Sequence, residues 1–219
     1  FGPPGWLAVG VPLACILLAH LDRTAEALVL AAGGPLAALG MSRAMARPSP
    51  AWAPAGVLYV ALPVVALVWL RSHDASGERM ILWLVLAVAA SDTGAFFAGR
   101  LIGGPLLAPR VSPKKTWAGL GGAVASSALV GVVLSALDGQ APPAGVLAVA
   151  GAVLAVVAQG GDLAESAFKR HFGAKDASGL IPGHGGMMDR VDGLVAAAAC
   201  LALFQWATAV SYTHLTLPT

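Results

Sequence analysis

Residues that could bind phosphates and a divalent cation are concentrated in two segments of the chain, residues 92–115 and residues 162–192. These segments contain 14 of the 24 charged residues and all four lysines. Carboxylates are ligands for Mg²⁺, while lysine and arginine neutralise phosphate oxygens. Because both kinds of side chain occur together in an otherwise apolar chain, we expect the two segments to form a single polar site.

The first segment combines a carboxylate at membrane depth with a pair of lysines. Asp92 lies halfway along the apolar run 80–99, where a charge costs about 2.5–3.5 kcal/mol and usually marks function; a satisfied hydrogen bond between helices is the other interpretation. Downstream, Ser112 is predicted to cap a helix, with Lys114 and Lys115 in its first turn. Cations are unfavourable at that end, so the pattern indicates a bound anion, or lysines that reach lipid headgroups.

The second segment begins with charged residues at helical spacing. If the helix predicted over 143–161 continues, then Asp162, Glu165, Ser166 and Lys169 share one of its faces. A solvated helix end has the same pattern, so this spacing alone does not identify a site.

A glycine-rich stretch follows, in which His184 stands next to Gly185 and Gly186. Glycines allow backbone N–H groups to approach a ligand closely, as in phosphate-binding loops. Asp189 and Asp192 open the last predicted helix, at an end where carboxylates are favourable and could also hold a divalent cation. We interpret this combination as a site for Mg²⁺ with phosphates.

The composition excludes a soluble enzyme. Of the 219 residues, 58% are hydrophobic and 11% are charged, whereas a soluble domain carries about 25% charged residues. The net charge of +2 gives no basis for binding nucleic acid through bulk charge. Cys15 and Cys200 lie inside apolar runs, so we expect buried and inert thiols.

Seven apolar runs predict an all-α fold, a polytopic membrane helical bundle with about seven transmembrane helices. We divide the chain into N-terminal membrane helices over 1–79, a membrane domain with the polar site over 80–210, and an anomalous Thr-rich tail over 211–219 with the character of an artefact. The runs cover residues 6–21, 25–41, 52–70, 80–99, 117–137, 143–161 and 191–210.

The distribution of cations predicts the orientation. When the seven runs alternate in direction, ten of the 13 cations fall on one side. The positive-inside rule assigns that side to the cytoplasm. We therefore predict an integral membrane protein of the cell's inner membrane, with the polar site facing the cytoplasm.

The charged blocks resemble the signature of one enzyme family, the phosphatidate cytidylyltransferases or CDP-diacylglycerol synthases. The resemblance covers residues 80–210, and because that family usually has more spans, we expect residues to be missing before Phe1. It rests on Ser166-Ala-Phe-Lys169-Arg170, on Lys175-Asp176, on Pro182-Gly-His184-Gly185-Gly186-Met-Met-Asp189-Arg190-Val-Asp192, and on the upstream blocks Ser91-Asp92-Thr93 and Ser112-Pro-Lys-Lys-Thr-Trp117.

The resemblance implies a reaction in which phosphatidate attacks the α-phosphorus of CTP, giving CDP-diacylglycerol and pyrophosphate for phospholipid synthesis. It implies Mg²⁺ as the cofactor, with room for a second cation. The implied partners are CTP, phosphatidate and membrane lipid, without nucleic acid, and a homodimer is one expected assembly because many members of the family are dimers.

The resemblance also assigns roles to residues by their motif positions. The expected metal ligands are Asp162 and Asp189, with Asp192 and Asp92 as further candidates. The catalytic candidates are Asp162, Asp189, Lys169, Arg190 and His184. The substrate-binding candidates are Asp92, Ser112, Lys114, Lys115, Arg170, Lys175, Asp176, Gly185 and Gly186.

Other functions stay open at this stage. A CTP-dependent polyprenol or phytol kinase has related charged blocks, but it moves the γ-phosphoryl group to a lipid hydroxyl. A secondary transporter or anion channel also has an intramembrane carboxylate and apolar runs broken by Gly and Pro. The chain could also be an inactive fragment of the enzyme.

Overall fold

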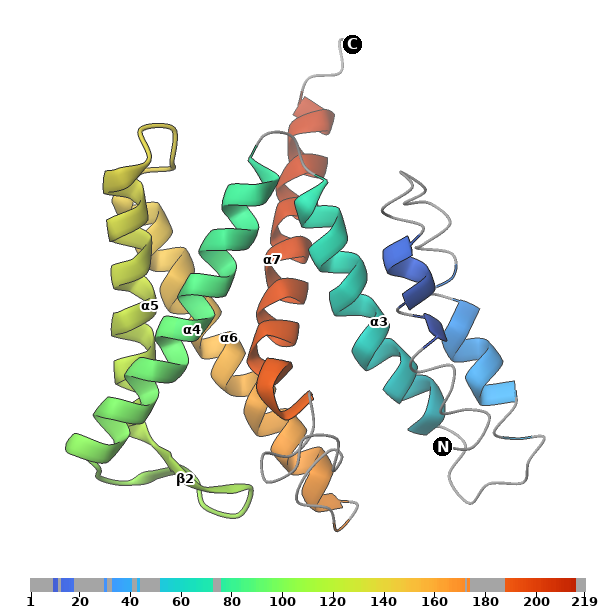
Figure 1. Ribbon diagram of the computed structural model, residues 1–219, viewed down its shortest axis with the longest axis horizontal. Coiled ribbons are helices and arrows are strands. Elements are labelled where there is room, and N and C mark those ends of the chain that lie inside the picture. Colours follow the sequence, from blue (N-terminus) through green and yellow to red (C-terminus); the bar gives the residue numbers. More distant parts are fainter. Residues whose placement is uncertain are drawn as a thin grey trace. The chain divides into compact units, whose positions relative to one another are not determined.

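The computed structural model divides into two compact units, which are described separately below: residues 1–78 with 208–219, and residues 79–207. The structure describes residues 10–11, 13–17, 30, 33–40, 43, 52–72, 76–171, 173 and 188–215, and within these it describes only the backbone at 52–56, 188–190 and 208–215. The elements are α3 (Trp52–Arg71), α4 (Gly77–Leu101), β1 (Leu106–Ala108), β2 (Ser112–Thr116), α5 (Trp117–Leu137), α6 (Ala144–His171) and α7 (Met188–Leu215) (Figure 1).

The all-α prediction is confirmed apart from one short hairpin. Among the described residues, three helices are long and apolar enough to cross a membrane, namely α4, α5 and α6. The shorter apolar stretches Val57–Arg71 and Val191–Ala207 lie in α3 and α7. The full set of about seven spans therefore stays a prediction. Helix α7 ends at Leu215 and so includes the first part of the Thr-rich tail over 211–219.

In the first unit, a small apolar core forms around helix α3. Its buried members are Val11, Cys15, Ala38, Val57 and Ala61. The Cys15 side chain is buried, as predicted, whereas Cys200 in the second unit is only partly buried.

The predicted helix start at Ser112 is wrong. Residues Ser112–Thr116 form strand β2, which pairs antiparallel with β1, and helix α5 begins only at Trp117. Thr116 has an extended backbone (φ −117°, ψ 158°), and its hydroxyl accepts a hydrogen bond from the Gly119 amide at 3.0 Å. Because Thr116 satisfies the first turn of α5 as its N-cap, Lys114 and Lys115 lie before the helix and not in its first turn.

The helices of the second unit approach one another closely through glycines. A Cβ atom added to Gly94 of α4 would lie 2.5 Å from the Gly122 carbonyl oxygen of α5. One added to Gly151 of α6 would lie 2.6 Å from the Ser127 carbonyl oxygen of α5. Small residues let helix backbones pack closely in membranes, where no hydrophobic effect drives helix association.

Serine hydroxyls of α5 add hydrogen bonds across the same contacts. Ser126 donates to the Ala90 carbonyl of α4 at 2.7 Å, and Ser127 donates to the Gly151 carbonyl of α6 at 2.8 Å. Each hydroxyl is thereby satisfied inside an apolar bundle, where an unpaired polar group would be costly. Glycine contacts and serine hydrogen bonds together fix α4 and α6 on α5.

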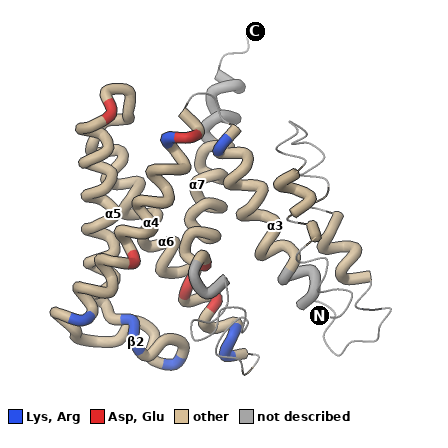
Figure 2. The backbone as a smooth tube through the Cα atoms, viewed as in Figure 1, with Lys and Arg blue, Asp and Glu red and all other residues tan. Residues whose placement is uncertain are grey.

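Most cations of the second unit lie at one end of its helices. Figure 2 shows them at the end that carries β2, whereas the opposite end has few charges. At that opposite end, Arg79 is 3.2 Å from Asp138 and 2.9 Å from the side-chain oxygen of Gln140. This contact ties the start of α4 to the connection between α5 and α6.

The close helix contacts predict a position-specific effect of glycine replacement. Gly122→Leu places a Cβ atom 2.4 Å from that of Ala98, so it should destabilise the α4–α5 contact. Overpacking costs about 1–3 kcal/mol, which lowers the melting temperature of a chain of this size by roughly 2–12 °C. Gly121→Leu is the matched control, because a Cβ atom there meets nothing within 4 Å. Equal melting temperatures in detergent for the two variants would contradict the packing.

Candidate functional site

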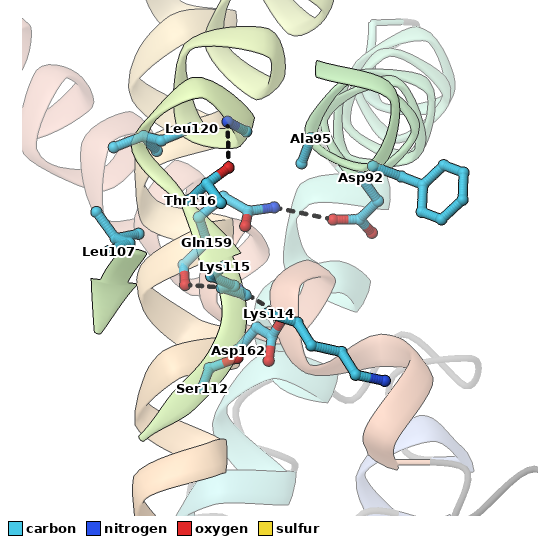
Figure 3. A pocket seen from close by; sticks show the side chains of 12 residues that line it. Asp92, Ala95, Leu107, Ser112, Lys114, Lys115, Thr116, Leu120, Gln159 and Asp162 are labelled. Atoms are coloured by element: carbon cyan, nitrogen blue, oxygen red, sulfur yellow. Dashed lines mark hydrogen bonds and ion pairs between the residues drawn. The ribbon is translucent and has the colours of Figure 1, made fainter. Parts of the chain in front are cut away.

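A cavity of about 340 Å³ opens at the charged end of the second unit, between helices α4, α5 and α6 and the hairpin. Its lining mixes apolar side chains with charged ones (Figure 3). The lining residues are Asp92, Ala95, Phe96, Leu107, Ser112, Lys114, Lys115, Thr116, Gly119, Leu120, Gln159 and Asp162.

Strand β2 places Lys115 in the lining of this cavity. Lys114 and Lys115 both line the cavity, but Lys114 is exposed and its ammonium extends away from Asp162 (Figure 3). The Lys115 ammonium lies 2.6 Å from the Asp162 carboxylate and 3.2 Å from the main-chain oxygen of Gln159. The Lys115 side chain is 16% exposed and that of Asp162 37%, so water screens this ion pair only in part.

Asp92 enters the site from helix α4. Its Oδ1 atom accepts a hydrogen bond from the Gln159 amide at 3.2 Å. Gln159 is not among the site residues predicted from the sequence, although it carries the first polar side chain of α6 and directly precedes Gly160. A lone polar residue in an apolar helix next to a charged motif is the signal that could have identified it.

Helix α6 continues beyond its apolar part as far as His171. The prediction that Asp162, Glu165, Ser166 and Lys169 share one face of this helix is therefore confirmed. The Ser166 hydroxyl donates to Asp162 at 3.3 Å, and the Lys169 ammonium lies 3.6 Å from a Glu165 carboxylate oxygen. Glu165 is 6% exposed, and among the described residues its Oε2 atom has no hydrogen-bond partner. This oxygen is the one that faces the Lys169 ammonium, so it is ion-paired although the contact is too long for a hydrogen bond.

The first turn of helix α7 lies beside this face of α6. A Cβ atom added to Gly161 would lie 2.5 Å from that of Ala196 and 3.2 Å from the Asp192 carbonyl oxygen. The Asp192 side chain accepts a hydrogen bond from the Gly193 amide at 2.7 Å. The Asp162 and Glu165 carboxylates are both close enough to Asp192 to repel it. Three acidic side chains from two helices therefore converge here.

The structure brings together several of the predicted site residues and leaves others undescribed. Asp92, Ser112, Lys114, Lys115 and Asp162 line the cavity, while Lys169, Arg170 and Asp192 lie on α6 and α7. Asp189 and Arg190 belong to the first turn of α7 by their backbone, and their side chains lie outside what is described. The predictions for Lys175, Asp176, His184, Gly185 and Gly186 fall outside the described residues.

The acidic residues near the cavity suit Mg²⁺ by residue type. Within the described part of the chain, no group of three or more His, Cys, Asp or Glu side chains is arranged to hold a metal ion. The residue types nevertheless suit a hard cation, because Asp162 and Glu165 both place a carboxylate near that of Asp192. The residues thus fit Mg²⁺ by type, without forming a preorganised cage.

The chain belongs to the cytidylyltransferase family, whose sequence profile matches residues 6–208. It is 47% identical over 153 residues to a phosphatidate cytidylyltransferase of Brucella suis biovar 1, covering 70% of this chain and 56% of that protein. A protein of the same name from Pseudomonas aeruginosa is 41% identical over 152 residues, covering 68% and 56% of the two chains. The chain thus spans about half the length of these relatives.

The Lys115–Asp162 pair predicts a difference between the two neighbouring lysines. Lys115→Met leaves Asp162 without its cation and should lower the free energy of unfolding by about 1–2 kcal/mol, reduced by the partial exposure of Asp162. Lys114→Met is the matched control, because Lys114 is exposed. Thermal unfolding in detergent checks this, and a Lys115→Met melting temperature equal to that of Lys114→Met would disprove the pairing.

Proposed function

We propose that the chain transfers the cytidylyl group of CTP to phosphatidate, forming CDP-diacylglycerol and pyrophosphate for phospholipid synthesis. The observation that carries this proposal is the cavity in which Lys115 of β2 meets Asp162 of α6 and Asp92 of α4. Support comes from the family and from relatives that are named phosphatidate cytidylyltransferases. Membership of a family of transferases also supports an enzymatic function over transport.

The reaction requires little acid–base chemistry from the protein. A phosphate oxygen of phosphatidate is already an anion, and it forms a bond to the α-phosphorus of CTP while the bond to the bridging oxygen of pyrophosphate breaks. The main barrier is the approach of two polyanions, so positioning and charge neutralisation supply most of the catalysis. In this proposal, Lys115 and Lys114 hold phosphates at the cavity, and Lys169, Arg170 and Arg190 add positive charge beside it.

Mg²⁺ is part of the proposal, with Asp162 and Asp192 as its ligands from α6 and α7, together with Asp189 from the first turn of α7. When bound, the ion would neutralise the triphosphate and stabilise the leaving pyrophosphate. Lys115, now paired with Asp162, would then be available to a phosphate oxygen. His184, Lys175, Asp176, Gly185 and Gly186 are proposed to contact phosphates, on the basis of the family motif alone.

The proposed location of the site is the cytoplasmic face of the inner membrane. CTP dissolves in water and phosphatidate stays in the leaflet, so the site must be open to both. The cavity lies at the end of apolar helices that carries most of the second unit's cations, which fits the positive-inside rule. Its mixed lining, with Phe96 and Leu107 beside the charged residues, suits an amphipathic substrate.

The position of a radiolabel in the lipid product tests the reaction. Purified chain is incubated with Mg²⁺, with either phosphatidate or a lipid alcohol, and with CTP labelled on either the α- or the γ-phosphate. We expect the α-label in the liponucleotide and the γ-label in pyrophosphate. A γ-labelled lipid formed from a lipid alcohol would instead establish the kinase alternative, and unlabelled lipid in every reaction would contradict both.

Replacing the carboxylate at the centre of the site should stop the reaction. Asp162→Asn removes the charge that pairs with Lys115, and we expect turnover to fall at least about 100-fold, equivalent to about 2.7 kcal/mol in the barrier. Asp138→Asn is the control, because Asp138 pairs with Arg79 away from the cavity. Initial rates of pyrophosphate release measure both variants, and comparable rates would remove Asp162 from the proposed mechanism.

A further inference from the structure

Gln159 is a buried polar residue at the point where the apolar part of α6 meets the charged part. From Ala144 to Ala158 the helix contains only Ala, Gly, Val and Leu. Gln159 is 6% exposed, and Asp162 follows one helical turn later. A buried amide without partners is costly, so its placement requires specific hydrogen bonds.

Both polar groups of Gln159 contact residues of the cavity. The side-chain amide donates to Asp92 Oδ1 of α4 at 3.2 Å, and the main-chain carbonyl accepts from the Lys115 ammonium of β2 at 3.2 Å. Figure 3 shows these contacts, with Gln159 lying between Asp92 and Lys115. One residue of α6 thereby connects a second helix and the hairpin.

The hydrogen bond to Asp92 occupies only one of its carboxylate oxygens. Among the described residues, Asp92 Oδ2 has no hydrogen-bond partner, and Asp92 lines the cavity. A neutral amide holds the carboxylate in place and leaves its negative charge intact. An arginine or lysine in the same position would cancel that charge. The second oxygen therefore stays available to a ligand.

We propose that Gln159 is a positioning residue for the transfer reaction, which orients Asp92 of α4 beside the Lys115–Asp162 pair and keeps Asp92 Oδ2 directed to the bound substrate. The inference rests on the proposed function. The Gln159 side chain therefore affects turnover only by orienting Asp92. The contact between the main-chain carbonyl of Gln159 and Lys115 is kept when the side chain is replaced.

A reciprocal exchange tests the hydrogen bond without any assay of activity. Gln159→Glu opposes two carboxylates and should lower the melting temperature in detergent. Adding Asp92→Asn puts the amide donor at position 92 and the carboxylate acceptor at position 159, with the same net charge as the wild type. The double variant should recover most of the lost melting temperature. A double variant no more stable than Gln159→Glu would overturn the proposed contact.

A double-mutant cycle tests the positioning role. Gln159→Met keeps the side-chain length and removes the donor, and we expect kcat/KM for CTP to fall about tenfold or more, as for residues that orient a ligand from behind. In an Asp92→Asn background the same replacement should change kcat/KM less than about twofold, because the residue it acts through is already altered. Equal losses in both backgrounds would overturn the proposal.

The controls separate this inference from the proposed function. Gln140→Met replaces a glutamine that also bonds to a charged residue, Arg79 at the far end of the unit, and should leave kcat/KM unchanged. An active wild type with a normal Gln159→Met variant would overturn the positioning role alone. A wild-type chain that forms no liponucleotide would overturn the proposed function and the positioning role together.

Discussion

The ion pair between Lys115 and Asp162 is the interaction on which the site depends. It joins a two-stranded hairpin to an apolar helix, at 2.6 Å and with both side chains partly shielded from water. An unpaired charge in such surroundings is expensive, and a paired one is tolerated when further hydrogen bonds satisfy its remaining atoms. The Gln159 carbonyl and the Ser166 hydroxyl supply these bonds. The pair thus holds together the elements that would otherwise meet only through apolar contact.

This polar centre exists because the surrounding helices come unusually close. Glycines at 94, 122 and 151 remove the side chains that would keep α4, α5 and α6 apart, and Ser126 and Ser127 bridge the helices by hydrogen bonds. Large apolar side chains remain exposed on the outside, including Leu129, Val149 and Val153. An arrangement with small residues inside and large apolar ones outside is what a helical bundle in lipid requires, since lipid gives helices no hydrophobic reason to associate.

The same arrangement explains why a charged site can sit at the end of apolar helices. Lys115 of the hairpin pairs with Asp162 of α6, and Lys169 pairs with Glu165 within α6, so each sign offsets the cost of the other. Glu165 is buried, and its Oε2 atom lies 3.6 Å from the Lys169 ammonium.

The sequence by itself determined the helical membrane character, the two charged segments and the shared face of Asp162, Ser166 and Lys169, because these follow from composition and from the period of a helix. It misplaced the start of α5, since Ser112 and Thr116 are both good caps and only pairing with β1 selects Thr116. It could not reveal that Gln159 contacts Asp92 or that Lys115 and not Lys114 reaches Asp162. The first contact joins residues 67 positions apart and the second joins residues 47 apart, so tertiary packing alone decides them.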